Sequence, residues 1–154
     1  MKIVDIHEYM PVLQGILSEG RSVRFTVTGS SMSPFLIHER DSVIISPLSS
    51  PLKAGDIVFY QRDNGQYVMH RICRVREDGL YLIGDAQTQI EGPVRKDQVF
   101  GQIRTVFRKG KKITEKDPVW KFFSGIWIHM IPCRPFFIRM AAWFSRRPQN
   151  KKAG

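Results

Sequence analysis

The sequence has few of the residues that build metal sites or disulfide frameworks. It contains two cysteines, Cys73 and Cys133, and four histidines, at no spacing typical of zinc ligands. Because Cys73 stands in an apolar run, we expect a buried, reduced thiol there. The sequence therefore argues against a zinc enzyme and against a disulfide-rich domain, and it predicts no metal and no other cofactor.

Long hydrophobic runs are also missing. The longest uncharged stretch of the C-terminal region, residues 122–133, has twelve residues, whereas a bilayer-spanning helix needs about twenty. Residues 2–20 include Asp5, Glu8 and Glu19, so we expect no secretory signal there. Apolar residues recur at helical spacing in this segment, which predicts an amphipathic helix packed on the domain. They are Ile3, Ile6, Met10, Leu13, Ile16 and Leu17.

Acidic residues are absent after Asp117, although the net charge of the whole chain is +10. This asymmetry indicates an anionic partner surface, either a membrane or a nucleic acid. The basic residues of the region are Lys121, Arg134, Arg139, Arg146, Arg147, Lys151 and Lys152.

The same region, residues 119–144, is rich in tryptophan, phenylalanine, isoleucine and methionine, and Pro132 and Pro135 interrupt it. This pattern favours short helices lying on a membrane surface over helices packed as ordinary core or crossing the bilayer. Because the aromatic residues form apolar blocks, they do not resemble a nucleic-acid stacking surface, and no nucleic acid is expected. The expected location is a peripheral or monotopic membrane association through this segment; the side of the membrane stays open, with the cytoplasmic side favoured.

The remaining sequence is typical of one mostly-β domain. Its 154 residues suffice for a single core, and short alternating segments are separated by turn signals such as Asp63-Asn64-Gly65. We expect a curled or barrel-like sheet, preceded by a helical segment (1–21), spanning 22–117 and followed by the aromatic segment 118–154. The predicted strands are residues 22–27, 41–46, 57–61, 67–76, 80–83 and 98–108.

A serine in a turn and a histidine on a later strand suggest a nucleophile and its base. Ser31 lies in residues 28–34 (TGSSMSP), and His70 follows 39 residues later in residues 68–72 (VMHRI). A serine hydroxyl needs a neighbouring base and donors for the developing oxyanion. Alone, each would be explained as a turn residue or a core histidine; together they indicate a hydrolase.

Six segments, in order, resemble the conserved boxes of type I signal peptidases and cover about residues 23–107. They are 27–36 (VTGSSMSPFL), 41–43 (DSV), 53–59 (KAGDIVF), 70–72 (HRI), 84–85 (GD) and 99–103 (VFGQI). The resemblance implies a signal-peptidase-type β fold and a membrane-associated serine endopeptidase that cleaves a signal or leader peptide after a small residue. Its partners would be a peptide or preprotein substrate and an anionic membrane surface.

The resemblance also implies roles for individual residues. Ser31 is the nucleophile, and His70 stands where the bacterial branch has a lysine, which is similar to the Ser/His pair of the endoplasmic reticulum and archaeal enzymes. The Ser31 backbone N–H is the first oxyanion donor. Gly29 replaces a serine that donates in some members, so Ser30 could substitute, while Met32 packs beneath the serine or lines the substrate cleft.

The acidic member of the site departs from the family pattern. In the Ser/His branch a Gly-Asp pair is followed six residues later by an aspartate that orients the histidine. Here residues 84–91 read GDAQTQIE, so that position is Glu91. Either carboxylate could serve, and we expect Glu91 to orient His70 and Asp85 to support the site.

Two alternatives stay open. Self-cleaving repressor peptidases share the β fold and the Ser-Met motif, but they use a lysine base. A catalytically degenerate domain that binds peptide or membrane is the second alternative, because the acidic box is altered.

Overall fold

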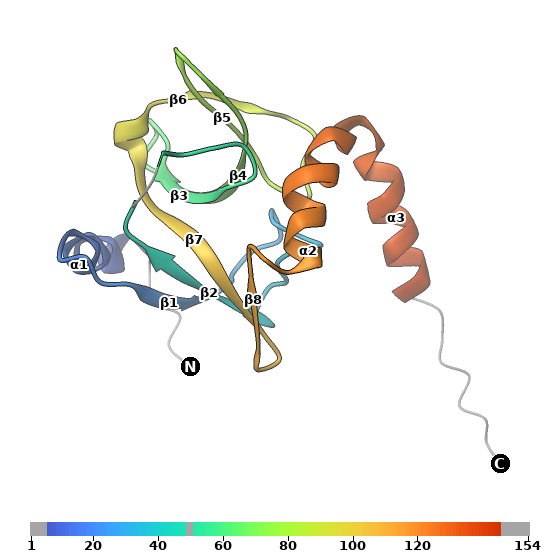
Figure 1. Ribbon diagram of the computed structural model, residues 1–154, viewed down its shortest axis with the longest axis horizontal. Coiled ribbons are helices and arrows are strands. Elements are labelled where there is room, and N and C mark those ends of the chain that lie inside the picture. Colours follow the sequence, from blue (N-terminus) through green and yellow to red (C-terminus); the bar gives the residue numbers. More distant parts are fainter. Residues whose placement is uncertain (1–5, 49–50, 146–154) are drawn as a thin grey trace.

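The computed structural model describes residues 6–48 and 51–145, and its strands form one antiparallel sheet (Figure 1). The predicted strands are found with nearly the expected bounds, and two further strands join them. The strands are β1 (Val23–Thr26), β2 (Asp41–Ser46), β3 (Ile57–Gln61), β4 (Tyr67–Arg76), β5 (Gly79–Ile83), β6 (Glu91–Val94), β7 (Val99–Arg108) and β8 (Lys111–Thr114).

The sheet is curled but open. Its order is β1-β2-β7-β3-β4-β5-β6, with β8 paired to the end of β7. Among the described residues, β1 and β6 end the sheet without pairing to each other, so the prediction of barrel-like closure is wrong. The mostly-β architecture is confirmed. An open β1 leaves backbone groups on one side of the strand available to an extended partner.

The two unpredicted strands carry misleading local signals. β6 contains Gly92-Pro93, and proline is tolerated in a sheet mainly at its edge, where β6 lies. β8 follows a turn at Lys109 and Gly110, both with positive φ (49° and 79°), and only Ile113 within it is buried. Its lysines made it resemble a solvated basic patch instead of a strand.

The N-terminal helix α1 (Ile6–Ser18) packs on the sheet as predicted. Met10, Leu13 and Leu17 are buried in the main core with residues of β1, β2 and β7. Ile3 lies outside the described residues. The helix stands at the opposite side of the sheet from the C-terminal helices (Figure 1).

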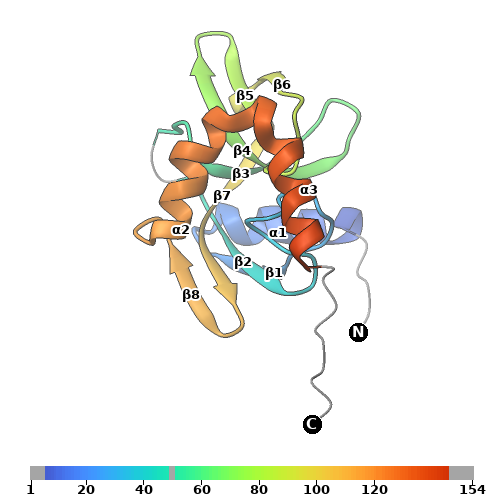
Figure 2. The same cartoon turned by 90° about the vertical axis from the view of Figure 1, so that its right-hand side faces the viewer.

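The C-terminal segment forms a second helical layer. It begins at α2 (Pro118–Lys121), continues through a π-helical turn (Phe122–Ile126) and a 3-10 segment (Trp127–Cys133), and ends in α3 (Arg134–Ser145). Figure 2 shows these helices as an outer layer beside the sheet. None of the helices in the described ranges is long and apolar enough to cross a bilayer.

The first half of this segment belongs to the core. Trp120, Phe123 and Trp127 are buried in the same cluster as α1 and the sheet. Phe35 joins them, with its ring 5.3 Å from that of Trp120 and 5.1 Å from that of Phe123. The alternative of ordinary packing thus holds for this half, because its aromatic rings fill the space beside the serine turn.

Candidate active site

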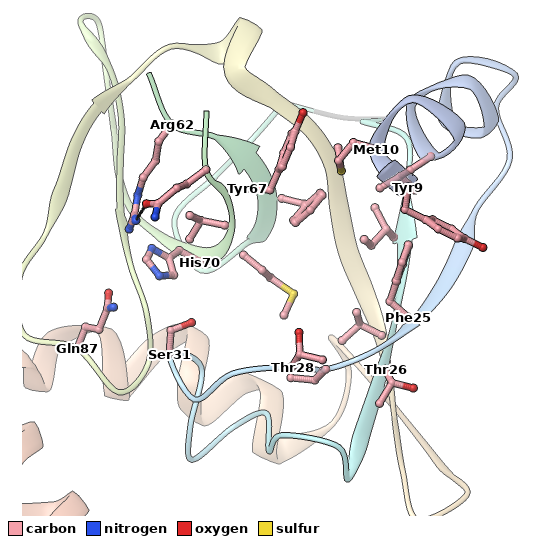
Figure 3. Close-up of a pocket in the computed structure, with 18 residues that line it drawn as sticks. Tyr9, Met10, Phe25, Thr26, Thr28, Ser31, Arg62, Tyr67, His70 and Gln87 are labelled. Atoms are coloured by element: carbon pink, nitrogen blue, oxygen red, sulfur yellow. Dashed lines mark hydrogen bonds between the residues drawn. The ribbon is translucent and has the colours of Figure 1, made fainter. Parts of the chain in front are cut away.

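A cleft of about 450 Å³ lies between α1, β1 and β4 (Figure 3). Residues from Phe25 to Thr28 line one wall, and residues from Tyr67 to His70 line the facing wall. Tyr9, Met10 and Leu13 of α1 close its apolar end. Ser31 and His70 both line this cleft, so the structure brings the proposed nucleophile and base to one site.

Ser31 is held in a compact turn directly after β1. The Gly29 N–H donates to Nδ1 of His38 (2.8 Å), and Gly29 has φ +84°, a conformation that favours glycine. The Ser33 N–H donates to the Ser30 carbonyl (3.1 Å). Met32 is buried beneath the turn in the main core, while Gly29 and Ser30 are exposed. Ser31, the proposed nucleophile, therefore stands in a hydrogen-bonded turn that packs on the main core.

A second loop, residues 84–87, is hydrogen-bonded to the backbone of Ser31. The Ala86 N–H donates to the Ser31 carbonyl (3.0 Å), and a Cβ added at Gly84 would lie 2.4 Å from the same oxygen. Only glycine allows this approach, which explains physically why a glycine stands at this position. Gln87 lines the cleft beside Ser31 (Figure 3), and its Oε1 accepts the Gly84 N–H (3.2 Å).

His70 is buried on β4, with 1% of its surface exposed. Its Nδ1 lies 3.2 Å from the hydroxyl of Tyr60, which is itself fully buried on β3. Burial lowers the pKa of His70 to about 4, although the charge of Glu91 opposes the shift. At neutral pH the imidazole is therefore uncharged, as a general base must be.

Glu91 reaches His70 through Tyr60. Burial, and after it the nearby Glu91 carboxylate, raises the pKa of the Tyr60 hydroxyl. Two nitrogens of Arg62 donate to the two oxygens of Glu91, each at 2.9 Å. Burial raises the pKa of Glu91, but its interactions with Arg62 and Tyr60 outweigh burial and keep the value below its ordinary range. Glu91 is therefore an ionised acceptor at neutral pH.

These contacts favour one histidine tautomer. Ionised Glu91 can only accept a hydrogen bond, which favours a Tyr60 hydroxyl that points its proton toward Glu91 and accepts from Nδ1 of His70. In that arrangement the proton of neutral His70 is on Nδ1. The lone pair is then on Nε2, the nitrogen that must face a serine in a serine hydrolase.

Asp85 serves the structure around the site. Its carboxylate forms two hydrogen bonds with Arg71, at 2.9 and 2.8 Å, and both side chains are fully buried. Nε1 of Trp127 donates to the Asp85 carbonyl (2.8 Å). Arg71 also donates to the Gly55 carbonyl (3.0 Å). Asp85 is thus one of the residues that hold the loop next to Ser31 in place.

Arg134 fixes the same loop from the C-terminal side. Its guanidinium is fully buried and donates to the carbonyls of Gly84 and Gln87 (3.0 Å each) and of Trp127 (3.1 Å). Burial lowers the pKa of Arg134. Arg134 stands in a segment expected at the surface, and the buried carbonyls explain why its side chain instead turns inward.

Sequence reasoning missed Tyr60, Arg62 and Gln87. The Asp63-Asn64-Gly65 turn could have indicated Tyr60, because a hairpin around this turn pairs Val58 with His70. Tyr60 is two residues after Val58, so its side chain lies on the same face of the sheet as His70. Arg62 and Gln87 lie outside the strands, where no register predicts their direction.

Comparison with known proteins agrees with this geometry. The family model described as Peptidase S24-like matches residues 1–104, and its superfamily of serine peptidases includes the type I signal peptidases. No curated protein and no solved structure matches the chain significantly. The sequence-based prediction of a serine peptidase of this superfamily is confirmed at that level. With two thirds of its length matched and a serine and histidine on one cleft, the chain belongs to the Peptidase S24-like family of serine peptidases.

Proposed function

We propose that the protein is a serine endopeptidase that cleaves a signal or leader peptide after a small residue, with Ser31 as nucleophile and His70 as general base. The observation that carries this proposal is the shared cleft: Ser31 and His70 line it together, and Nδ1 of His70 lies 3.2 Å from the Tyr60 hydroxyl. The resemblance to type I signal peptidases of the Ser/His branch supports the substrate class and the small residue before the scissile bond.

The reaction follows from these positions. Ser31 Oγ attacks the scissile carbonyl carbon while its proton moves to Nε2 of His70. The C–N bond then breaks, and His70 returns the proton to the departing amine. Water, activated by the same imidazole, hydrolyses the acyl-enzyme. Glu91, acting through Tyr60, stabilises the imidazolium that forms transiently.

Two groups beside Ser31 are suited to hold the oxyanion. The Ser31 backbone N–H is one, as the resemblance implies. The side-chain amide of Gln87 is the other: its oxygen accepts the Gly84 N–H, so its nitrogen is the end that can donate into the cleft. Gln87 would then replace the hydroxyl donor that Gly29 lacks.

The cleft fits an extended peptide. Thr28 lies across the cleft from His70 (Figure 3), and Val27, Val68 and Met69 also line it. A substrate strand between these walls could pair with backbone groups at the open side of β1. Its scissile carbonyl would lie at the Ser31 end, and its apolar side chains toward α1.

The test is cleavage of peptides that carry an Ala-x-Ala junction, free in solution and in membrane-embedded preproteins. We expect the wild-type chain to cleave them and the Ser31→Ala and His70→Ala variants to lose activity by at least about 10³-fold. Ser22→Ala and His129→Ala, exposed residues away from the cleft, serve as matched controls. If wild type and site variants are equally inert on all substrates, the protein is a binding domain and the enzymatic proposal fails.

The family match favours one further candidate, self-cleavage, since repressor peptidases of this superfamily cut their own chain. Intact mass of the purified protein decides between the two. Fragments that accumulate over time in wild type, but not in Ser31→Ala, would indicate an intramolecular reaction. A stable mass together with cleavage of added peptide supports action on a separate substrate.

A further inference from the structure

The last helix presents large apolar side chains to solvent. Phe136 is 66% exposed, Met140 39%, Trp143 57% and Phe144 56%. These residues of α3 are spaced at i, i+4, i+7 and i+8, so they share one face of the helix. We refer to these four residues as the α3 stripe. A contiguous exposed apolar face of this kind marks an interaction surface.

The stripe is distinct from the part of the segment that belongs to the core. Trp120 and Trp127 are buried, at 3% and 4% exposure, and Phe137 and Ile138 of α3 pack against the core. The helix is therefore docked by one set of side chains and exposes another. Because the core is already filled by the first set, the stripe contributes little to the stability of the domain.

The charge around the stripe indicates its partner. No acidic residue occurs from position 118 to the last residue of the given sequence, whereas Lys121 and Arg139 are exposed on the described helices. The basic residues of positions 146–152 follow α3 directly in sequence and lie outside the described residues. Aromatic side chains beside unopposed basic residues are the composition of helices that lie in the headgroup region of anionic bilayers.

We propose that the α3 stripe inserts into the surface of an anionic lipid bilayer, with α3 parallel to the membrane plane. Arg134 joins the start of α3 to the Gly84–Gln87 loop, which grips Ser31. The membrane-bound helix is thus coupled rigidly to the candidate active site, and the cleft is held near the bilayer. Binding to lipid does not itself depend on the proposed peptidase activity.

The proposal is tested by co-sedimentation of the full chain with vesicles of phosphatidylcholine containing about one third phosphatidylglycerol. We expect binding that weakens with added salt and is much weaker on pure phosphatidylcholine. The Phe136→Ser/Trp143→Ser double variant should lower the partition coefficient about 100-fold, about tenfold for each side chain removed from the lipid. Arg139→Gln should weaken binding to the anionic vesicles alone.

The matched control is Val12→Ser/Val75→Ser, at two residues that are 56% and 41% exposed on α1 and β4. This variant should bind vesicles as wild type does. Circular dichroism of both double variants checks that each is folded, which is expected because all four positions are exposed.

Tryptophan fluorescence gives an independent reading of depth. Trp120 and Trp127 are already buried, so a blue shift on adding vesicles reports Trp143. The shift should vanish in Trp143→Phe, which keeps an apolar aromatic ring in the stripe and retains binding.

Three results would overturn the proposal. The first is an absence of vesicle binding by wild type, and the second is equal weakening by the stripe variant and the control. The third is a wild-type dimer in light scattering that Phe136→Ser/Trp143→Ser converts to a monomer while vesicle binding is unaffected. In that case a second copy of the chain, not lipid, covers the stripe.

Discussion

Replacement of His70 should change how the stability of the protein depends on pH. Burial lowers the pKa of His70 to about 4 in the folded chain, whereas an exposed histidine in the unfolded chain titrates near 6.5. Between these two values the unfolded state binds the extra proton, so the free energy of unfolding falls as the pH falls. Stability from this group is complete above pH 6.5 and is lost progressively down to pH 4.

The size of the effect follows from the shift. Each pKa unit corresponds to about 1.4 kcal/mol, so moving from pH 7 to pH 4.5 should cost wild type about 2 kcal/mol through His70 alone. Asparagine is the matched replacement, since its amide can approach the Tyr60 hydroxyl as Nδ1 does but does not titrate. His70→Asn should therefore lack this part of the pH dependence.

Urea unfolding of wild type and His70→Asn at pH 7 and pH 4.5 measures the difference. The lowered pKa of Asp41 also makes the protein less stable in acid, but this contribution is the same in both proteins and cancels in the comparison. Equal losses of stability in the two proteins would refute the buried, neutral histidine. The same low pKa predicts that the acid limb of peptidase activity lies near pH 4, well below the 6–7 expected for an exposed imidazole.

Three further outcomes are expected around the nucleophile. Tyr60→Phe removes the hydroxyl between His70 and Glu91 and should lower kcat about 10- to 100-fold with little change in KM, and an unchanged kcat would rule out this link. Gln87→Ala should lower kcat about 100-fold in the same assay, with KM nearly constant, if its amide holds the oxyanion; an effect on KM alone would assign it to substrate binding. Gly84→Ala forces a Cβ against the Ser31 carbonyl and should reduce activity, and it should lower the free energy of unfolding by about 1–3 kcal/mol in thermal or urea unfolding. In the control Gly125→Ala, the added Cβ meets no atom within 4 Å, so activity should be unchanged.

The sheet could largely be predicted from the sequence because its strands alternate clearly and end at strong turns. Residues 41–46, 57–61 and 67–76 coincide with β2, β3 and β4. The strands β6 and β8 were not predicted, because the proline of β6 and the lysines of β8 are typical of loops. These segments become strands only by pairing with β5 and β7. The sheet stays open because curvature and closure depend on packing between strands, not on local pattern.

The residues of the candidate site could be predicted from the sequence better than the contacts that connect them. Ser31 and His70 stand in recognisable motifs, but the connection to Glu91 runs through Tyr60, a residue with every sign of an ordinary core aromatic. The burial of Arg134 could not be predicted from the sequence either. Its position in a basic, aromatic segment favours solvent, and only the three carbonyls that converge on it make burial favourable.

The inward turn of Arg134 has a practical consequence for anyone who shortens this protein. A chain cut after Asp117 would lose Trp120, Phe123 and Trp127 from the hydrophobic interior and the guanidinium that braces the backbone next to the nucleophile. Loss of lipid affinity in such a deletion would not distinguish a collapsed fold from a missing anchor. Residues 118–145 are part of the folded domain, because their buried side chains complete its core. Only point substitutions on the exposed face of these helices can therefore separate membrane binding from catalysis.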